Sequence, residues 1–206
     1  MGITVSTVNA AIVAAAQAAR RAEVELNAAD ARMGDGDTGV TVRRVFEALE
    51  AARPGGEDLG QAFAELAKVC SGATGSSLGT LVTVAMMTLA KPLKGQVDLP
   101  WAELPALLAD VRDRMLARGG ARLGDKTMVD MLDAVIRATD GLDAPEAMAI
   151  AALRAADETL EDFRDRPNRI GRARMFADRT VGMDDPGMLA FHRLLRAVTG
   201  AEVPHA

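Results

Sequence analysis

Residues 77–90 read SLGTLVTVAMMTLA, and this stretch decides between an all-helical fold and a fold that contains a β-sheet. Its centre, TLVTV at residues 80–84, is rich in the β-branched residues that are typical of strands. The apolar run is nevertheless long for one strand and ends near Pro92, so its length favours a helix. Because the rest of the chain is helical in its patterning almost throughout, we expect an all-α protein.

The helical spacing of apolar residues predicts eight helices separated by turns that contain glycine or proline. The first helix is expected to begin at a Ser6 cap. The predicted ranges are 6–29, 41–52, 58–70, 77–90, 100–118, 127–139, 143–163 and 185–200. No internal repeat or long linker divides the chain, so we expect a single domain over residues 1–206.

The connections between these helices fall into two classes that alternate along the chain. One class reads as ordinary turns: RPGGE at 53–57, LKGQVDL at 93–99 and DGLD at 140–143. The other is rich in glycine and in charged or hydroxyl residues: MGDGDTG at 33–39, SGATGSS at 71–77, GGARLGDK at 119–126 and the long segment 164–184. In an up-and-down bundle, alternate connections lie at the same end, so we expect the four loops of the second class to meet at one rim.

Composition excludes several classes of protein. The net charge of −5 argues against a general binder of nucleic acid or of anionic membranes. The longest apolar stretch is shorter than the roughly 20 residues of a membrane helix, and the N-terminus lacks a secretory pattern, so we expect a cytoplasmic protein. With one cysteine and two histidines, the chain lacks the parts of a disulfide, a zinc site or a Ser-His-Asp triad. We expect Cys70 and His192 to be packed groups.

The acidic glycine loop GDGDTG, residues 34–39, has the spacing of three known motifs but lacks a defining part of each. A dinucleotide fingerprint requires a preceding strand, and here the preceding segment is helical. A P-loop requires lysine where Val40 stands, and a calcium-binding hand requires glutamate where Phe46 stands. None of the three motifs therefore explains this loop.

What remains at this loop is a group of carboxylates, Asp30, Asp35 and Asp37, within eight residues. Carboxylates at such spacing can converge on a hard cation such as Mg²⁺, and a bound cation then attracts phosphate. The alternative is a solvated acidic turn, since Asp and Gly are common in turns. The other loops expected at the same rim favour the metal site.

The three remaining rim loops each have a binding and a structural interpretation. Residues 71–80, SGATGSSLGT, lead into a helix whose first N–H groups can bind an anion or can simply be capped. Lys126 and Thr127 offer a charge and a hydroxyl to phosphate, or form another helix cap. The basic stretch 164–174 suits either a polyphosphate clamp or a solvated loop.

Five of these segments occur in the order and at the spacing of one known family. They are GDGDTG (34–39), SGATG (71–75), GDKTM (124–128), GRA (171–173) and DPG (185–187). On these motifs the chain, from about Val8 to Val198, resembles the L subunit, or nucleotide-binding domain, of dihydroxyacetone kinases. The resemblance implies an antiparallel, up-and-down eight-helix barrel with the nucleotide site at one rim.

The resemblance also implies roles for individual residues. Asp30, Asp35 and Asp37 would hold two Mg²⁺ ions that bridge the phosphates of ADP or ATP, and Arg172 would join them in catalysis. Nucleotide contacts are implied for Thr38, Gly39, Val40, Thr41, Gly72, Ala73, Thr74, Gly119, Met128, Arg172, Asp185, Pro186 and Gly187. Lys126 and Thr127, chosen above on their chemistry, complete the expected nucleotide contacts.

The activity implied by the resemblance is phosphoryl transfer to a short hydroxyketone, which a separate K subunit holds covalently on a histidine. Two phosphoryl donors stay open: exchanging ATP, or a phosphoenolpyruvate-driven carrier protein that recharges a resident ADP. A stand-alone L chain favours the second. Also open are a homodimer, a nucleotide-sensing module without transfer activity, and a metal-dependent phosphohydrolase.

The chain departs from the family pattern at a few positions near the expected phosphates. The family often has asparagine at Thr41, a second glycine at Ser71, and proline and a bulky apolar residue at Ser76 and Ser77. These departures bear on the identity of the hydroxyketone more than on nucleotide binding, and a related tetrose is an alternative substrate.

Overall fold

The computed structural model of the chain describes residues 2–200, and this part is helical with no strand. Its α-helices are α1 (Val5–Asp30), α2 (Thr38–Ala52), α3 (Leu59–Ala73), α4 (Ser77–Ala90), α5 (Leu104–Gly119), α6 (Met128–Thr139), α7 (Pro145–Arg164) and α8 (Pro186–Val198). Two 3₁₀ segments, η1 (Trp101–Glu103) and η2 (Arg172–Thr180), lie in the connections. The all-α prediction is confirmed, including a helix at residues 77–90.

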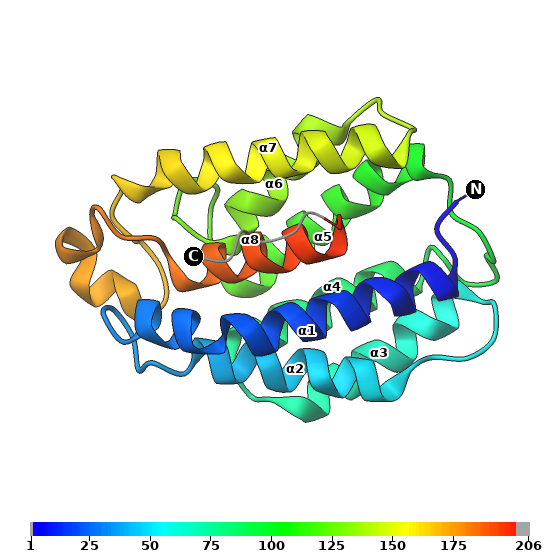
Figure 1. The fold of residues 1–206 in the computed structure, drawn as a ribbon, viewed down its shortest axis with the longest axis horizontal. Coiled ribbons are helices and arrows are strands. Elements are labelled where there is room, and N and C mark those ends of the chain that lie inside the picture. The colour runs from blue at the N-terminus through cyan, green and yellow to red at the C-terminus, as the bar shows by residue number, and fades with distance from the viewer. Residues whose placement is uncertain (1, 201–206) are drawn as a thin grey trace.

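The eight helices form a closed ring (Figure 1). Each helix packs against the next one in the chain, and α8 returns to pack against α1, while α6 also contacts α8. The buried side chains of the interior come from all eight helices and include Leu26, Leu66, Met131 and Met188. The predicted up-and-down barrel is confirmed. Among residues 2–200, no helix has the length and apolarity needed to cross a membrane.

The beginning of α1 differs from the prediction. Thr4, not Ser6, is the N-cap: its hydroxyl accepts a hydrogen bond from Thr7 N at 3.3 Å, and Thr7 Oγ1 accepts one from Thr4 N at 3.3 Å. This reciprocal pair occupies the orphan amides of the first turn. The cap prediction was wrong because both residues are good caps and only the backbone conformation distinguishes them.

Other boundaries move by a few residues towards the rim. α2 begins at Thr38 instead of about residue 41, and α3 continues to Ala73 instead of ending near Cys70. The long segment before α8 contains η2, which the apolar pattern did not predict because most of its residues are polar. α2 and α3 therefore extend into two of the loops that were expected to bind ligand, and η2 lies within a third.

The four loops of the glycine-rich class lie at the same end of the ring, as their alternation predicts. The α7–α8 loop reaches the α1–α2 loop through an ion pair between Arg172 and Asp35. The same loop reaches the α5–α6 loop, where Arg169 N donates to Asp125 O at 3.2 Å. At the start of α4, Leu81 lies against Gly119 at the end of α5. Figure 1 shows the α1–α2 and α7–α8 loops together at one end and the N-terminus at the other.

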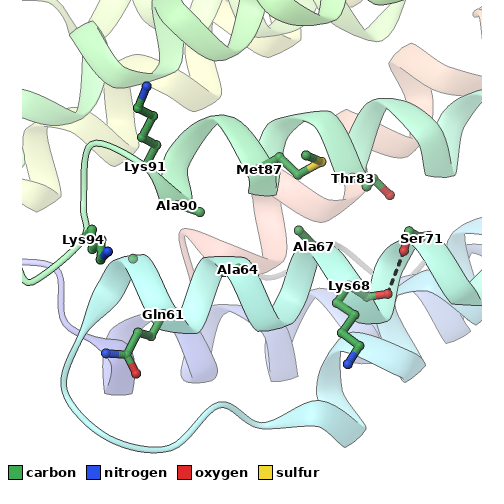
Figure 2. Close-up of a pocket in the computed structure, with 11 residues that line it drawn as sticks. Gln61, Ala64, Ala67, Lys68, Ser71, Thr83, Met87, Ala90, Lys91 and Lys94 are labelled. Atoms are coloured by element: carbon green, nitrogen blue, oxygen red, sulfur yellow. Dashed lines mark hydrogen bonds between the residues drawn. The ribbon is translucent and has the colours of Figure 1, made fainter.

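A groove of about 530 Å³ lies between α3 and α4 (Figure 2). Its walls are small or apolar, with Ala64 and Ala67 on α3 and Met87 and Ala90 on α4, and lysines stand at its rim. At one end of the groove the first turn of α3 lies against the chain that follows α4, where Gly60 N donates to Leu93 O at 3.0 Å. The groove contains none of the acidic residues of the α1–α2 loop.

Gly60 is the residue on which this close approach depends. A Cβ there would lie 2.4 Å from Lys94 Cα and 2.6 Å from Ala90 O, which are backbone atoms that cannot rotate away. We expect Gly60→Ala to lower the free energy of unfolding by about 1–3 kcal/mol through overpacking. Chemical denaturation measures this change.

Gly55→Ala is the matched control, because a Cβ at residue 55 meets nothing within 4 Å. The control is expected to keep the denaturation midpoint of the wild type. Equal midpoints for all three proteins would contradict the close packing of α3 against the α4–α5 connection.

Candidate metal centre

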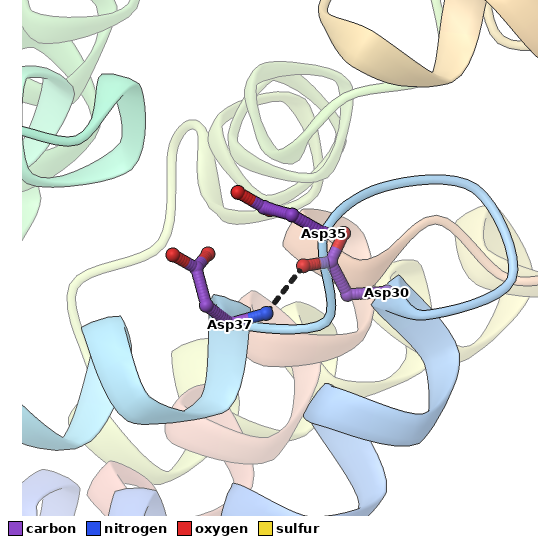
Figure 3. A group of neighbouring side chains, drawn as sticks. All are labelled: Asp30, Asp35 and Asp37. Atoms are coloured by element: carbon purple, nitrogen blue, oxygen red, sulfur yellow. Dashed lines mark hydrogen bonds between the residues drawn. The ribbon is translucent and has the colours of Figure 1, made fainter.

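Three carboxylates converge where α1 ends and α2 begins (Figure 3). Asp30 is the last residue of α1 and is buried, while Asp35 and Asp37 are exposed in the connecting loop. One carboxylate oxygen from each residue lies within 4.8 Å of the other two. Oxygen-only donors at this spacing suit a hard divalent cation such as Mg²⁺. The structure thus brings together the three residues that the sequence proposed.

Side chains of α1 cap the start of α2. Asp30 Oδ2 accepts hydrogen bonds from Asp37 N at 2.9 Å and Thr38 N at 3.2 Å. Asn27 Oδ1 accepts from Gly39 N at 2.8 Å and Val40 N at 3.2 Å. These amides are the ones that a helix N-terminus would offer to an anion. Here they are already bonded, so phosphate has to be attracted by other groups.

The same capping explains why Asp37 is available as a ligand. Asp37 occupies the N-cap position of α2, yet its carboxylate makes no capping hydrogen bond. An Asp at this position normally bonds the amides of the first turn. Because Asn27 and Asp30 bond those amides instead, the Asp37 carboxylate extends towards the other two acids.

The glycines of this loop shape it around Asp30. Gly36 has φ of +78°, a conformation that side chains other than glycine rarely adopt. A Cβ on Gly34 would lie 2.2 Å from Asp30 Oδ1, so only glycine allows the loop to pass this close to the carboxylate. These glycines therefore position the acids and are not a phosphate cradle.

Arg172, the cation expected to take part in catalysis, reaches one of the three acids, Asp35. It begins η2 and makes an ion pair with Asp35, and its side chain is 63% exposed. A guanidinium beside the carboxylates can neutralise charge on a phosphate group held there. The structure thus joins a cation from the α7–α8 loop to the acids of the α1–α2 loop.

Lys126 does not point towards the acids. It is 1% exposed, and its Nζ donates to the carbonyl oxygens of Arg164, Arg166 and Thr180 at 3.1, 2.7 and 3.0 Å. Burial lowers the pKa of this ammonium, with partial opposition from nearby carboxylates, of which Asp185 is the strongest. The sequence suggested a charge for phosphate, but the structure gives this residue three backbone partners instead.

Thr127 is the N-cap of α6, which is the structural alternative considered for it. Its Oγ1 accepts from Val129 N at 3.1 Å, and Asp130 Oδ2 accepts from Thr127 N at 2.7 Å. Asp130 Oδ1 also accepts from Gly124 N at 2.6 Å, so this buried carboxylate stabilises the turn at residues 124–127. Met128 then begins α6 beside Gly187, whose Cβ would lie 3.9 Å from that of Met128.

The DPG turn at residues 185–187 begins α8. Asp185 Oδ1 accepts from Gly187 N and Met188 N, both at 2.9 Å, and Pro186 occupies the first turn. Burial of its carboxyl group raises the pKa of Asp185 to about 6, against the lowering effect of these bonds and of Asn168. The side chain of Asp185 is therefore a helix cap.

The α3–α4 loop is shorter than expected. Gly72 and Ala73 lie in the last turn of α3, so the loop's available donors begin at Thr74. Thr74 Oγ1 accepts from Ser76 N at 3.1 Å, and Ser76 Oγ caps α4 by accepting from Gly79 N at 3.0 Å. The serine that departs from the family pattern at residue 76 is thus a helix cap.

Two residues expected to be packed groups are confirmed as such. Cys70 is fully buried, its thiol donates to Gly79 O at 3.5 Å, and burial raises its pKa. His192 is also buried, and its Nε2 lies 2.5 Å from Asp157 Oδ1. Neither residue contacts the three acids.

Sequence reasoning missed three polar residues that organise the rim: Asn27, Asp130 and Asn168. Asn27 had a local signal, because it lies one helical turn before Asp30. Asp130 had one too, since it completes a capping box with Thr127. Asn168 had none, because its side-chain amide donates to Lys126 O and Asp185 Oδ2, which are distant in sequence.

Comparison with known proteins gives a consistent result. A family model described as the DAK2 domain matches residues 32–200. The L-erythrulose 1-kinase of Mycolicibacterium smegmatis is 34% identical over 192 residues, which cover 85% of this chain and 32% of that protein. The ADP-binding subunit DhaL of the PEP-dependent dihydroxyacetone kinase of Escherichia coli is 27% identical over 169 residues, covering 79% of this chain and 80% of that subunit.

A solved structure has the same fold. The dihydroxyacetone kinase from C. freundii, in complex with AMP-PNP and Mg²⁺, superposes with a TM-score of 0.74 at 24% identity, over 98% of this chain and 35% of that one. The chain spans about a third of the length of the erythrulose kinase and of this structure. On the family match, the chain belongs to the DAK2-domain family and is a homologue of the L-type subunit or domain of dihydroxyacetone kinases.

Proposed function

We propose that this chain is the nucleotide-binding phosphotransfer subunit or domain of a kinase that acts on dihydroxyacetone or a related short hydroxyketone. The observation that carries the proposal is the convergence of Asp30, Asp35 and Asp37 beside helix amides that are already capped. Such a site attracts phosphate only through a cation, which is the requirement of a Mg²⁺–nucleotide site.

The chain's own residues would divide the work as follows. The carboxylate of Asp30 is held in place by hydrogen bonds from two backbone amides, whereas Asp35 and Asp37 are exposed and can adjust to a ligand. Together the three carboxylates offer enough oxygens to share between two Mg²⁺ ions. When bound, these ions would neutralise phosphate charge and align the group being transferred. Arg172 would add a positive charge from the opposite loop.

The nucleoside part is proposed to lie on the neighbouring loops. Gly119 and Met128 provide small and apolar surface near the start of α4 and the turn at residues 185–187. Thr74 and the first turn of α4 would meet the phosphates. Thr38 would contact the nucleotide through its side chain, since its amide is bonded to Asp30.

The acceptor is proposed to be bound outside this chain, on a K-type subunit or domain. Phosphoryl transfer asks the protein for positioning and charge, and no nucleophile of its own is required. The resemblance to the ADP-binding subunit of a PEP-dependent kinase supports recharging of a resident ADP by a phosphoryl carrier. The resemblance to an erythrulose kinase supports the second candidate, direct use of ATP with a ketotetrose as acceptor.

The metal site predicts nucleotide binding that requires Mg²⁺. We expect the wild type to bind ADP only when Mg²⁺ is present, and we expect Asp35→Asn to weaken this binding roughly ten- to hundredfold, since a charged contact is lost. Isothermal titration calorimetry, with and without Mg²⁺, measures both effects.

Asp143→Asn is the matched control, because Asp143 is exposed in the α6–α7 connection at the other end of the ring. It is expected to bind as the wild type does. Equal affinity of the wild type and Asp35→Asn would place the metal elsewhere and contradict the proposal.

The kinase proposal predicts product formation when the chain is mixed with a K-type subunit, a hydroxyketone and the correct donor. Dihydroxyacetone and erythrulose are tested as acceptors, each with ATP and with a phosphoenolpyruvate-driven carrier, and the phosphorylated product is measured. Nucleotide binding without product from any donor would instead favour a nucleotide-sensing module. Steady phosphate release from ATP without acceptor would favour a phosphohydrolase.

A further inference from the structure

The buried ammonium of Lys126 donates hydrogen bonds to backbone carbonyls at the end of α7 and in the connection between α7 and α8. Its three acceptors are the carbonyls of Arg164, Arg166 and Thr180. Arg164 is the last residue of α7, Arg166 stands at the beginning of the connection between α7 and α8, and Thr180 ends η2 within that connection. The Lys126 side chain, from the α5–α6 loop, therefore links the start of the α7–α8 connection to the end of η2.

Burial and backbone conformation both make the position of Lys126 unfavourable in free energy unless its contacts compensate. Burial of a lysine ammonium is unfavourable unless its hydrogen bonds are satisfied, and here three carbonyls satisfy them. Lys126 also has φ of +66°, a conformation that is disfavoured for residues other than glycine. Backbone strain of this kind persists where surrounding contacts enforce it, and it gathers at functional sites.

Asn168 makes a second set of links between the same segments. Its backbone N donates to Thr180 Oγ1 at 2.9 Å, and its side-chain Nδ2 donates to Lys126 O at 3.2 Å and to Asp185 Oδ2 at 2.7 Å. Asn168 is 1% exposed, so these bonds form out of contact with solvent. The α5–α6 loop, the base of the α7–α8 loop and the cap of α8 thus form one polar core.

Arg172 lies in the segment between these hydrogen-bonded residues. Gly171 and Arg172 lie between Asn168 and Thr180, and Arg172 makes the ion pair with Asp35. An arginine on a loop is positioned more precisely for phosphate recognition when the base of that loop is fixed.

We infer that Lys126 is a positioning residue that fixes the base of the 164–180 loop, so that Arg172 is presented to Asp30, Asp35 and Asp37. The inference rests on the proposed function, since it assigns Lys126 to the nucleotide site indirectly, through Arg172. It replaces the direct phosphate contact that the sequence suggested for this residue.

Hydrogen exchange tests the loop without any nucleotide. In Lys126→Met the three carbonyls lose their donor, so we expect faster amide exchange within residues 166–182, including the Gly182 amide that donates to Arg164 O at 2.8 Å. Amides of α1 to α4 are expected to exchange as in the wild type. Unchanged exchange at residues 166–182 would overturn the inference.

Arg112→Met is the matched control for loss of a cation. Arg112 links α5 to α6 by donating to Asp133 Oδ1 at 2.8 Å, away from the rim. It is expected to leave exchange at residues 166–182 unchanged. If Lys126→Met does not fold, Lys126→Gln replaces it, because a glutamine amide is uncharged and has only two N–H donors for the three carbonyls.

A double-mutant cycle then tests the link to Arg172, with ADP and Mg²⁺ as the probe. Arg172→Ala and Lys126→Met are each expected to weaken binding roughly ten- to hundredfold, which is the loss of one charged contact. The double variant is expected to be no weaker than Arg172→Ala alone, because Lys126 acts through Arg172.

The outcomes separate the two proposals. Additive losses, or no loss in Arg172→Ala, would overturn the positioning role even if the wild type binds Mg²⁺–ADP. A wild type that binds no nucleotide would instead overturn the proposed function, and the exchange result would still decide whether Lys126 fixes the loop.

Discussion

The candidate site depends on hydrogen bonds from the consecutive backbone amides at the start of α2 to two side chains at the end of α1. Asn27 and Asp30 accept the N–H groups of residues 37–40, which would otherwise face the rim and attract anions. This capping releases the Asp37 carboxylate and fixes Asp30 beside it. The result is a negatively charged loop that requires a cation before it can hold phosphate, so glycine-rich sequence and acidic chemistry are compatible here.

The closed ring of helices brings a positive charge to this acidic loop. Because successive helices alternate in direction, the loops after α1, α5 and α7 meet, and Arg172 from the α7–α8 loop reaches Asp35 in the α1–α2 loop. The two main cations have different surroundings: Arg172 is exposed beside Asp35, whereas Lys126 is buried among carbonyls. In this account the exposed cation meets the ligand, and the buried one holds the loop that carries it.

Apolar periodicity predicted the helices, loop alternation predicted which loops share one end, and the short spacing of Asp30, Asp35 and Asp37 predicted their grouping, because these signals are local or repeated. The closed barrel was implied by the family resemblance. The sequence did not predict the direction of the Lys126 side chain, whose partners lie 38 to 54 residues away. The cap of α1 and the extension of α3 were also missed, since several neighbouring residues suit each boundary equally. The assigned nucleotide contacts stay predictions, supported by family membership and by the position of their loops.

We propose that metal, and not the amides of residues 37–40, binds phosphate beside Asp30, Asp35 and Asp37. Diffraction from crystals grown with ADP and Mn²⁺ tests it most directly, because the anomalous signal locates the metal. We expect metal density among the carboxylates of Asp30, Asp35 and Asp37, in contact with the ADP phosphates, with the amides of residues 37–40 still hydrogen-bonded to Asn27 and Asp30. Phosphates bonded directly to those amides, or metal density away from the three acids, would contradict it.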